Sequence, residues 1–152
     1  MGDTDMLHYF AYGSNMNKDR MLERVGYIPE SMPGTLRGWQ LVFNKKAMDG
    51  TSGYANIVPD PAGEVQGVVY RVSEGDIDAL DRYEGYPNHY DRTELQLLAG
   101  MNEISAVVYI AVPEMIRDGL KPMKNYLDHL LAGREYLSPS YYSILEKVAT
   151  AD

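Results

Sequence analysis

The sequence predicts an α+β fold, a curved mixed β-sheet or barrel of about six strands with peripheral helices. Short runs of apolar and aromatic residues, typical of strands, recur between turn-forming residues. About four segments with helical spacing lie among them without a regular strand–helix alternation, which disfavours a parallel sheet wound with helices. The 152 residues suit one domain rather than two. We therefore expect a single domain over 1–152, with a core of about 7–150 after a short N-terminal tail.

The expected strands are rich in β-branched and aromatic residues, which favour an extended backbone. They span 7–12, 35–44, 54–59, 64–72, 90–98 and 103–112. The third and fourth are separated by Asp60-Pro61-Ala62-Gly63, which predicts a turn. Loops are expected at 26–34 and 45–53, where Pro, Gly and polar residues interrupt any regular pattern.

Helices are expected at 18–25, 73–84, 122–131 and 140–149. Ser73 can cap the second of these helices. The acidic Glu74 and Asp76 in its first turn interact favourably with the positive end of the helix dipole. Gly85 ends the same helix. The helix boundaries therefore follow from local residue chemistry.

Composition excludes several classes of function. Lys and Arg number 14 against 22 Asp and Glu, a net charge of −8, and no basic run occurs, so nucleic acid and anionic membranes are not expected partners. The absence of Cys excludes disulfides and thiolate chemistry. No apolar run reaches membrane-spanning length, and the first ten residues show no apolar signal core. We expect a cytoplasmic protein, a monomer or homodimer, whose partner is a small molecule.

The stretch Tyr9–Met16 is the centre of the functional prediction. An alternating strand breaks at Gly13, a residue that tolerates unusual backbone angles and lets a ligand approach the main chain. Ser14 and Asn15 follow, and a helix begins at 18. Such a corner leaves backbone N–H groups free to bind an anion or a developing oxyanion. An ordinary strand–loop–helix corner is the alternative interpretation.

Glu84 is the candidate for proton transfer. It ends a helix just before Gly85, where the negative end of the helix dipole and unpaired carbonyls disfavour a charged carboxylate. This position, together with any burial, would raise the pKa of Glu84 toward the value that suits a general acid or base near neutral pH. The alternative is a solvated glutamate at a helix end.

Other catalytic motifs are absent. The three histidines, His8, His89 and His129, do not lie at ligand spacing from one another or from a carboxylate, so no metal is expected. No P-loop occurs and no G-x-G-x-x-G motif follows a strand, so no nucleotide cofactor is expected. Ser14 lacks the second Gly of a G-x-S-x-G nucleophile motif, and no histidine suggests itself as its base.

Four segments in order resemble the γ-glutamylcyclotransferase family. Tyr9–Met16 resembles its Y-F-A-Y-G-S-N-[LM] signature, and Gly53–Ile57 its G-x-A-x-I strand. Glu64–Tyr70 is similar to its E-V-x-G-V-V-[WY] strand, and Leu80–Gly85 followed by Tyr90 to its L-D-x-x-E-G…Y segment. The match covers nearly the whole chain, except for the loops at 45–53 and 111–121.

The resemblance implies a small α+β fold around a curved β-barrel that releases 5-oxoproline from a γ-glutamyl compound, with no metal and no cofactor. It implies that Glu84 is the catalytic acid/base. The residues that it implies for substrate binding are Tyr12, Gly13, Ser14, Asn15, Met16, Tyr90, Tyr109 and Tyr141. The last is adjacent to Tyr142, and the sequence leaves open which of the two faces the pocket.

The implied chemistry suits these residues because the substrate's own α-amine attacks its side-chain carbonyl, so the protein needs no nucleophile. Cyclisation of γ-glutamyl amino acids or peptides is the leading interpretation, favoured by the Y-G-S-N form of the loop. A γ-glutamyl amine or a γ-glutamyl-capped biosynthetic intermediate is the alternative substrate. A non-catalytic binding module on the same fold and a purely structural protein are the alternatives from other classes.

Overall fold

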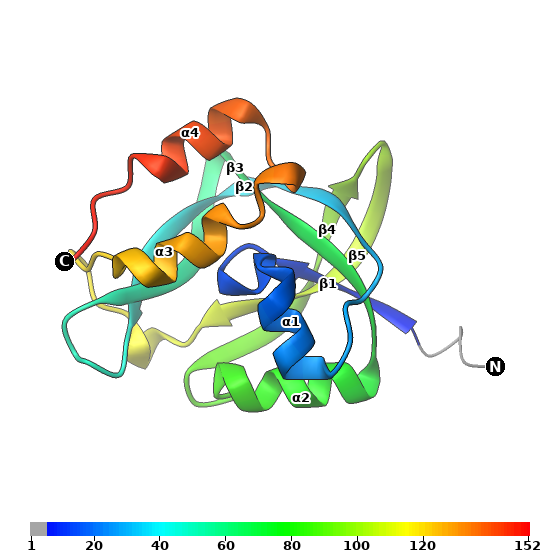
Figure 1. The fold of residues 1–152 in the computed structure, drawn as a ribbon, viewed down its shortest axis with the longest axis horizontal. Helices are drawn as coiled ribbons and strands as arrows, with labels where there is room; N and C mark the ends of the chain where they lie inside the picture. The colour runs from blue at the N-terminus through cyan, green and yellow to red at the C-terminus, as the bar shows by residue number, and fades with distance from the viewer. Residues whose placement is uncertain (1–5) are drawn as a thin grey trace.

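The computed structural model describes residues 6–152, which form a closed five-stranded barrel with four α-helices around it (Figure 1). The strands are β1 (Met6–Ala11), β2 (Ser31–Lys46), β3 (Gly53–Ser73), β4 (Tyr90–Ala99) and β5 (Asn102–Ala111). Their order in the sheet is β1-β3-β2-β4-β5, with antiparallel neighbours. A parallel contact of β1 with β5 at Tyr9 and Val107 closes the barrel. The predicted fold class is confirmed, and the predicted N-terminal tail lies outside the described residues.

The predicted turn at 60–63 is wrong, and for this reason the strand count is five rather than six. The segment lies inside β3, whose pairing with β2 runs from Arg37↔Glu64 to Trp39↔Pro59. Residues 60–63 therefore bulge opposite Gly38 alone, which has a φ of 88°. Turn-forming residues here bend one long strand, because β2 continues to pair with it on both sides of the bulge.

The predicted loop at 26–34 is wrong at its C-terminal end, because Ser31–Gly34 begin β2. Gly34 pairs with Gly67 of β3, and the ring of Phe10 lies over this pair. A Cβ on Gly67 would lie 2.3 Å from the carbonyl oxygen of Ala11 and 3.0 Å from the Phe10 ring. The backbone of β1 can pack this close because Gly67 has no side chain, and the Phe10 ring can lie here because neither Gly67 nor Gly34 has one.

The helices are α1 (Lys18–Val25), α2 (Glu74–Glu84), α3 (Lys124–Leu131) and α4 (Pro139–Glu146). Ser73 caps α2 in a reciprocal arrangement with Asp76, and the left-handed Gly85 (φ 68°) ends it. Asn17 caps α1 by accepting the N–H of Asp19 at 3.0 Å. All four predicted helices are therefore confirmed within a few residues.

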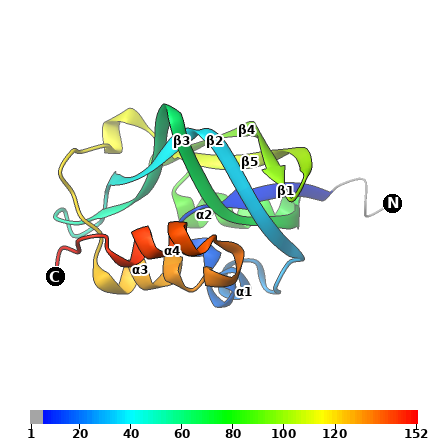
Figure 2. The same cartoon turned by 90° about the horizontal axis from the view of Figure 1, so that it is seen from above.

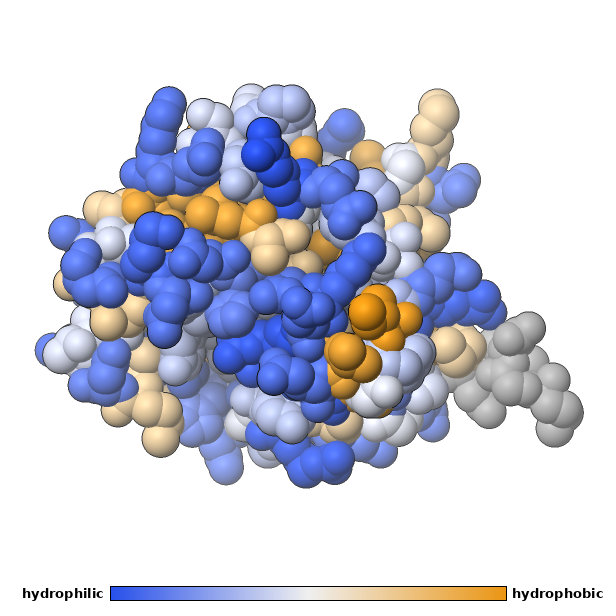
Figure 3. Space-filling model, viewed as in Figure 1, coloured by the Kyte–Doolittle hydropathy of each residue, from blue (hydrophilic) through white to orange (hydrophobic). Residues whose placement is uncertain are grey.

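Three of the helices, α1, α3 and α4, cover one side of the barrel (Figure 2). The alternation of β1 divides the core between two regions. Phe10 and Tyr12 pack with apolar side chains of the other strands, while Tyr9 and Ala11 pack toward a cluster that includes side chains of the helices. The face that carries the helices is mostly hydrophilic, with small apolar areas (Figure 3). Within residues 6–152, no helix has the length and apolar character needed to cross a membrane.

The close approach at Gly67 predicts a stability difference between two glycine substitutions. Gly67→Ala should lower the free energy of unfolding by about 1–3 kcal/mol, because its Cβ meets the Ala11 carbonyl and the Phe10 ring. Gly75→Ala is the control, since its nearest neighbour would be the Ser73 hydroxyl at 3.7 Å and Ala favours the helix by up to about 1 kcal/mol. Urea unfolding measures both, and equal stabilities of the two variants would contradict the packing.

Candidate active site

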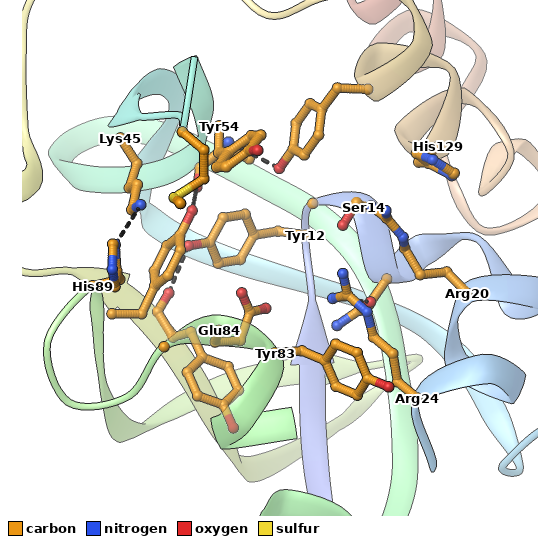
Figure 4. A pocket seen from close by; sticks show the side chains of 18 of the residues that line it. Tyr12, Ser14, Arg20, Arg24, Lys45, Tyr54, Tyr83, Glu84, His89 and His129 are labelled. Atoms are coloured by element: carbon orange, nitrogen blue, oxygen red, sulfur yellow. Dashed lines mark hydrogen bonds between the residues drawn. The ribbon is translucent and has the colours of Figure 1, made fainter. Parts of the chain in front are cut away.

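A polar cavity of about 670 Å³ opens between the barrel and the helices, a size that suits a small molecule. Its walls come from the loop after β1, from α1, from the end of β2, from the start of β3, and from α2, β4 and α3. Segments far apart in the sequence therefore meet here. Figure 4 shows the labelled side chains around this space.

The loop at Gly13, Ser14 and Asn15 forms one wall. Ser14–Met16 make a short 3-10 turn, in which Met16 N–H donates to Gly13 O at 3.1 Å. The N–H groups of Ser14 and Asn15 begin this turn, so they have no acceptor within it. The loop packs closely at Gly13, where a Cβ would lie 3.2 Å from Ala55 Cβ and 3.3 Å from the Tyr126 hydroxyl.

Asn15 fixes the loop from beneath. Its side chain is buried, and its Nδ2 donates to the Tyr9 hydroxyl at 2.9 Å while its Oδ1 accepts from Arg24 Nη1 at 3.0 Å. The Tyr70 hydroxyl donates to its backbone oxygen at 2.7 Å. The Asn15 side chain is therefore engaged in holding the loop, and the substrate-binding role of Asn15 stays a prediction that its backbone N–H is free to fulfil.

Met16 does not line the cavity, which corrects the expectation that it contacts substrate. Its side chain is fully buried in the core against Gly133, and its N–H is used inside the 3-10 turn. The turn reverses the chain after Asn15, so the apolar side chain points inward, as burial of its surface favours. The part of the loop that faces the cavity therefore consists of Gly13, Ser14 and Asn15.

Glu84 projects into the same cavity from the C-terminal end of α2 (Figure 4). Within the described residues, no hydrogen bond or ion pair holds its carboxylate. Burial raises the pKa of Glu84 above its ordinary value, and the positive charges of Arg24, Arg20 and Lys45 act in the opposite direction. The structure thus brings the two predicted centres, the loop and the carboxylate, into one cavity, whereas the catalytic role of Glu84 stays a prediction.

Tyr12, Tyr90 and Tyr109 line the cavity as expected. The Tyr12 hydroxyl donates to the carbonyl oxygen of Tyr109, and the Tyr90 hydroxyl donates to that of Ala55 at 2.7 Å. Burial raises the pKa of both phenols well above the ordinary value, so both keep their protons. With those protons committed, the two hydroxyl oxygens offer lone pairs to a ligand. Tyr109 instead donates to Asp81 Oδ1 at 2.8 Å.

Tyr141 does not line the cavity, contrary to the expectation from the sequence, and Tyr142 does not line it either. Both lie on α4, whose start is tied to β3. Ser138 N–H donates to Gln66 Oε1 at 2.8 Å, and Gln66 Nε2 donates to Ser138 Oγ at 3.1 Å. This anchor directs α4 to another part of the barrel, where Tyr142 lines a separate depression.

The sequence did not point to several other residues of the cavity wall, among them two arginines, a lysine, a histidine and a tyrosine with polar groups that face the cavity. Arg20 and Arg24 stand four residues apart on α1, immediately after the loop, so helical spacing could have placed them on the loop's side. Lys45, His89 and Tyr126 come from distant segments and give no local signal. The Tyr126 hydroxyl accepts the N–H of Ala55 at 3.0 Å, which leaves its own proton available to a ligand.

The buried Lys45 and the half-buried His89 form a hydrogen-bonded pair opposite α1 (Figure 4). Lys45 is 3% exposed and donates from Nζ to Lys46 O and to His89 Nδ1, each at 2.9 Å. Burial and the Lys45 charge lower the pKa of His89. Because Lys45 can only donate, His89 accepts at Nδ1 and is neutral, and one proton of the ammonium remains for a ligand.

Within residues 6–152, no three His, Asp or Glu side chains gather closely enough to hold a metal ion. The donors that face the cavity are instead backbone amides, guanidinium groups, an ammonium and phenols. This set can bind carboxylates and stabilise a developing negative charge. Glu84 is a carboxylate of the wall that no hydrogen bond among residues 6–152 occupies, so it can accept a proton from a bound amine.

The fold and the cavity define a small α+β barrel protein with a pocket lined by charged, polar and aromatic side chains. A family model described as gamma-glutamyl cyclotransferase, AIG2-like, matches residues 9–129, and the chain belongs to this family. It is 31% identical to human gamma-glutamylcyclotransferase over 87 residues, 55% of this chain and 46% of the human protein. The mouse gamma-glutamylcyclotransferase is 35% identical over 81 residues, 51% of this chain and 43% of that protein.

The chain thus spans about half the length of the curated relatives it matches. The crystal structure of YkqA from Bacillus subtilis superposes with a TM-score of 0.84 at 22% identity, over 97% of this chain and 56% of YkqA. This similarity shows that the two share a fold.

The raised pKa of Glu84 predicts a pH-dependent effect of Glu84→Gln on stability. Between the ordinary glutamate pKa of 4.5 and the raised folded-state value, the native protein holds a proton that the unfolded chain has lost. The free energy of unfolding of the wild type therefore falls as pH rises through this window. We expect Glu84→Gln to be as stable as the wild type at about pH 4 and more stable at about pH 7.

Urea unfolding at both pH values measures this difference. Glu103→Gln, which removes an exposed glutamate of β5, controls for the loss of one negative charge. A wild type that is more stable than Glu84→Gln at neutral pH would show that the cavity stabilises the charged carboxylate instead.

Proposed function

We propose that this protein is a γ-glutamylcyclotransferase that uses Glu84 as its acid/base and releases 5-oxoproline from a γ-glutamyl compound. The observation that carries the proposal is the position of Glu84, a carboxylate without a hydrogen bond among the described residues, in the same cavity as the N–H groups of Ser14 and Asn15. Membership of the family supports the reaction type.

The γ-glutamyl group matches the donors and acceptors of the cavity. Its α-ammonium needs acceptors, and Glu84 together with the hydroxyl oxygens of Tyr12 and Tyr90 supplies them. Its α-carboxylate needs donors, and the free proton of Lys45 with the hydroxyl of Tyr126 can supply them. The walls therefore distinguish the two ends of the substrate's α-carbon by charge.

The reaction begins when Glu84 takes a proton from the α-ammonium. The freed amine attacks the side-chain carbonyl carbon, a C–N bond forms, and the carbonyl oxygen becomes an oxyanion that the N–H groups of Ser14 and Asn15 stabilise. The oxyanion then collapses, the bond to the departing nitrogen breaks, and Glu84 returns its proton to that nitrogen. The cyclised nitrogen still carries one proton more than the amide of 5-oxoproline, so Glu84, ionised again, takes this proton and passes it to the departing amine. The products are 5-oxoproline and an ammonium, and the two protons that the attacking nitrogen loses are the two that the departing nitrogen gains.

The magnitudes favour this route. A free amine with a pKa of about 8 costs roughly 1.4 kcal/mol to deprotonate at pH 7, which is within reach of a positioned base. One well-placed oxyanion donor contributes on the order of 3 kcal/mol. The nucleophile is tethered to the carbonyl that it attacks, so its effective molarity comes with the substrate. A nucleophilic Ser or Cys is therefore unnecessary.

Turnover tests the proposal. Glu84→Gln keeps the shape of the side chain but cannot accept a proton, and it should lower kcat for 5-oxoproline release by about 10²–10⁴-fold. γ-Glutamyl amino acids, glutathione and γ-glutamyl amines serve as substrates, and the circular dichroism spectrum confirms folding.

Glu103→Gln is the control and should retain wild-type activity. A folded Glu84→Gln variant with undiminished turnover would overturn the role of Glu84. A wild type that binds 5-oxoproline in calorimetry but turns over none of these compounds would identify a binding module.

A further inference from the structure

Two cations of the cavity wall, Arg20 and Arg82, have no hydrogen-bond or ion-pair partner among residues 6–152, and of these two Arg20 is half-buried whereas Arg82 is exposed. Arg24 is held by Asn15 Oδ1 and lies 4.9 Å from the centroid of the Tyr83 ring, and Lys45 is held by His89. Within residues 6–152, no hydrogen bond or ion pair involves the guanidinium of Arg20, which is half-buried in the wall. Its planar fork of donors is thus free and partly shielded from water.

The charge balance of the cavity calls for more negative charge than a γ-glutamyl group brings. The ionic side chains of the wall are Arg20, Arg24, Lys45, Arg82, Asp49 and Glu84. The Asp49 carboxylate is used within its own loop, where it accepts from the N–H groups of Thr51 and Ser52. The positive charge of the α-ammonium and the negative charge of the α-carboxylate cancel, so a γ-glutamyl group brings no net charge. An excess of positive charge therefore remains, in a protein whose net charge is −8.

The cyclic transition state decides where a second carboxylate would lie. The attacking nitrogen is bonded to the α-carbon on one side and to the attacked carbon on the other, so the α-carboxylate and the departing group flank it. The cations of the cavity are arranged to match, because Lys45 and the α1 arginines lie on opposite sides of Glu84, the group that faces the attacking nitrogen (Figure 4). The attacked carbon carries the oxyanion and faces Ser14, so the departing group is directed toward α1.

On that side, Arg20 is the group that can take a carboxylate. A guanidinium binds a carboxylate through two parallel hydrogen bonds, a geometry that an ammonium does not offer. His129 also lines this side, and its Nδ1 accepts from Asn17 Nδ2 at 3.0 Å, because Asn17 Oδ1 is occupied by Asp19 N–H. The His129 ring therefore carries its proton on Nε2, as a second donor on this face.

We propose that Arg20 binds the α-carboxylate of the departing amino acid and so selects γ-glutamyl amino acids over γ-glutamyl amines. This proposal rests on the cyclotransferase function proposed above. It makes Arg20 a specificity residue that contacts the half of the substrate that Glu84 and Lys45 do not hold. The half-buried position suits a departing group whose own side chain varies, because that side chain can extend toward solvent.

Two substrates that differ only in this carboxylate, γ-glutamyl-alanine and γ-glutamyl-ethylamine, test the proposal. The wild type should have a kcat/KM about 10–100-fold higher for γ-glutamyl-alanine than for γ-glutamyl-ethylamine, because a charge-assisted hydrogen bond contributes a factor of about this size. Arg20→Gln should lose this preference: kcat/KM for γ-glutamyl-alanine should fall about 10–100-fold further than kcat/KM for γ-glutamyl-ethylamine, which reports the effect of the Arg20 charge on Glu84 alone. Arg20→Lys should recover part of the preference, because it keeps the charge without the fork.

The exposed Arg37 of β2 lies outside the cavity wall, and Arg37→Gln is the matched control that should keep the wild-type preference. An equal fall for both substrates in Arg20→Gln, or a wild type without preference, would overturn the role of Arg20.

Binding separates this role from the reaction. In the Glu84→Gln background, adding Arg20→Gln should raise the Kd of uncleaved γ-glutamyl-alanine in calorimetry about 10–100-fold and leave that of γ-glutamyl-ethylamine unchanged. If Arg20→Gln weakens binding in this way but the wild type turns over no γ-glutamyl compound, the cyclotransferase function is overturned. The role of Arg20 as a contact for the carboxylate is then retained. The Arg20 proposal alone would be overturned if the wild type turns over substrate and Arg20→Gln changes neither the ratio of kcat/KM nor the ratio of Kd between γ-glutamyl-alanine and γ-glutamyl-ethylamine.

Discussion

The buried side chain of Asn15 is the interaction on which the site depends. It joins the Tyr9 hydroxyl of the barrel to the guanidinium of Arg24 on α1, while its backbone carbonyl accepts from Tyr70. One amide thereby fixes the loop amides, a barrel strand and the first helix relative to one another. A buried polar network of this kind is rigid when each member is satisfied, and leaving one unpaired carries a desolvation penalty.

The electrostatics of the cavity are set by a conflict between burial and charge. Burial favours the neutral form of Glu84, whereas Arg20, Arg24 and Lys45 favour the ionised form, and burial prevails. A carboxyl group in this balance can hold a proton or release it at modest cost, as an acid/base requires. The cations that restrain its pKa are also the groups able to hold substrate carboxylates, so one arrangement serves proton transfer and substrate binding.

The sequence predicted elements best where a local rule decides. Ser73 with Asp76, and Gly85 after Glu84, determine both ends of α2 by hydrogen bonds within a few residues. Prediction from the sequence was wrong where pairing with a distant strand overrides the local preference of the residues. Residues 60–63 have turn chemistry, yet β2 pairs on either side of them and retains them in β3 as a bulge. Gly34 is likewise drawn into β2 by its pairing with Gly67.

The sequence by itself determined the α+β class, the glycine corner at Gly13 and the helix-terminal position of Glu84, because each depends on residue types within one or two turns of chain. Only the tertiary structure decided that these two centres share a cavity, that Met16 and Tyr141 lie outside it, and that Lys45 and Arg20 flank Glu84. Barrel closure brings these distant segments together, and it depends on pairings between strands such as β1 and β5, which no local pattern encodes.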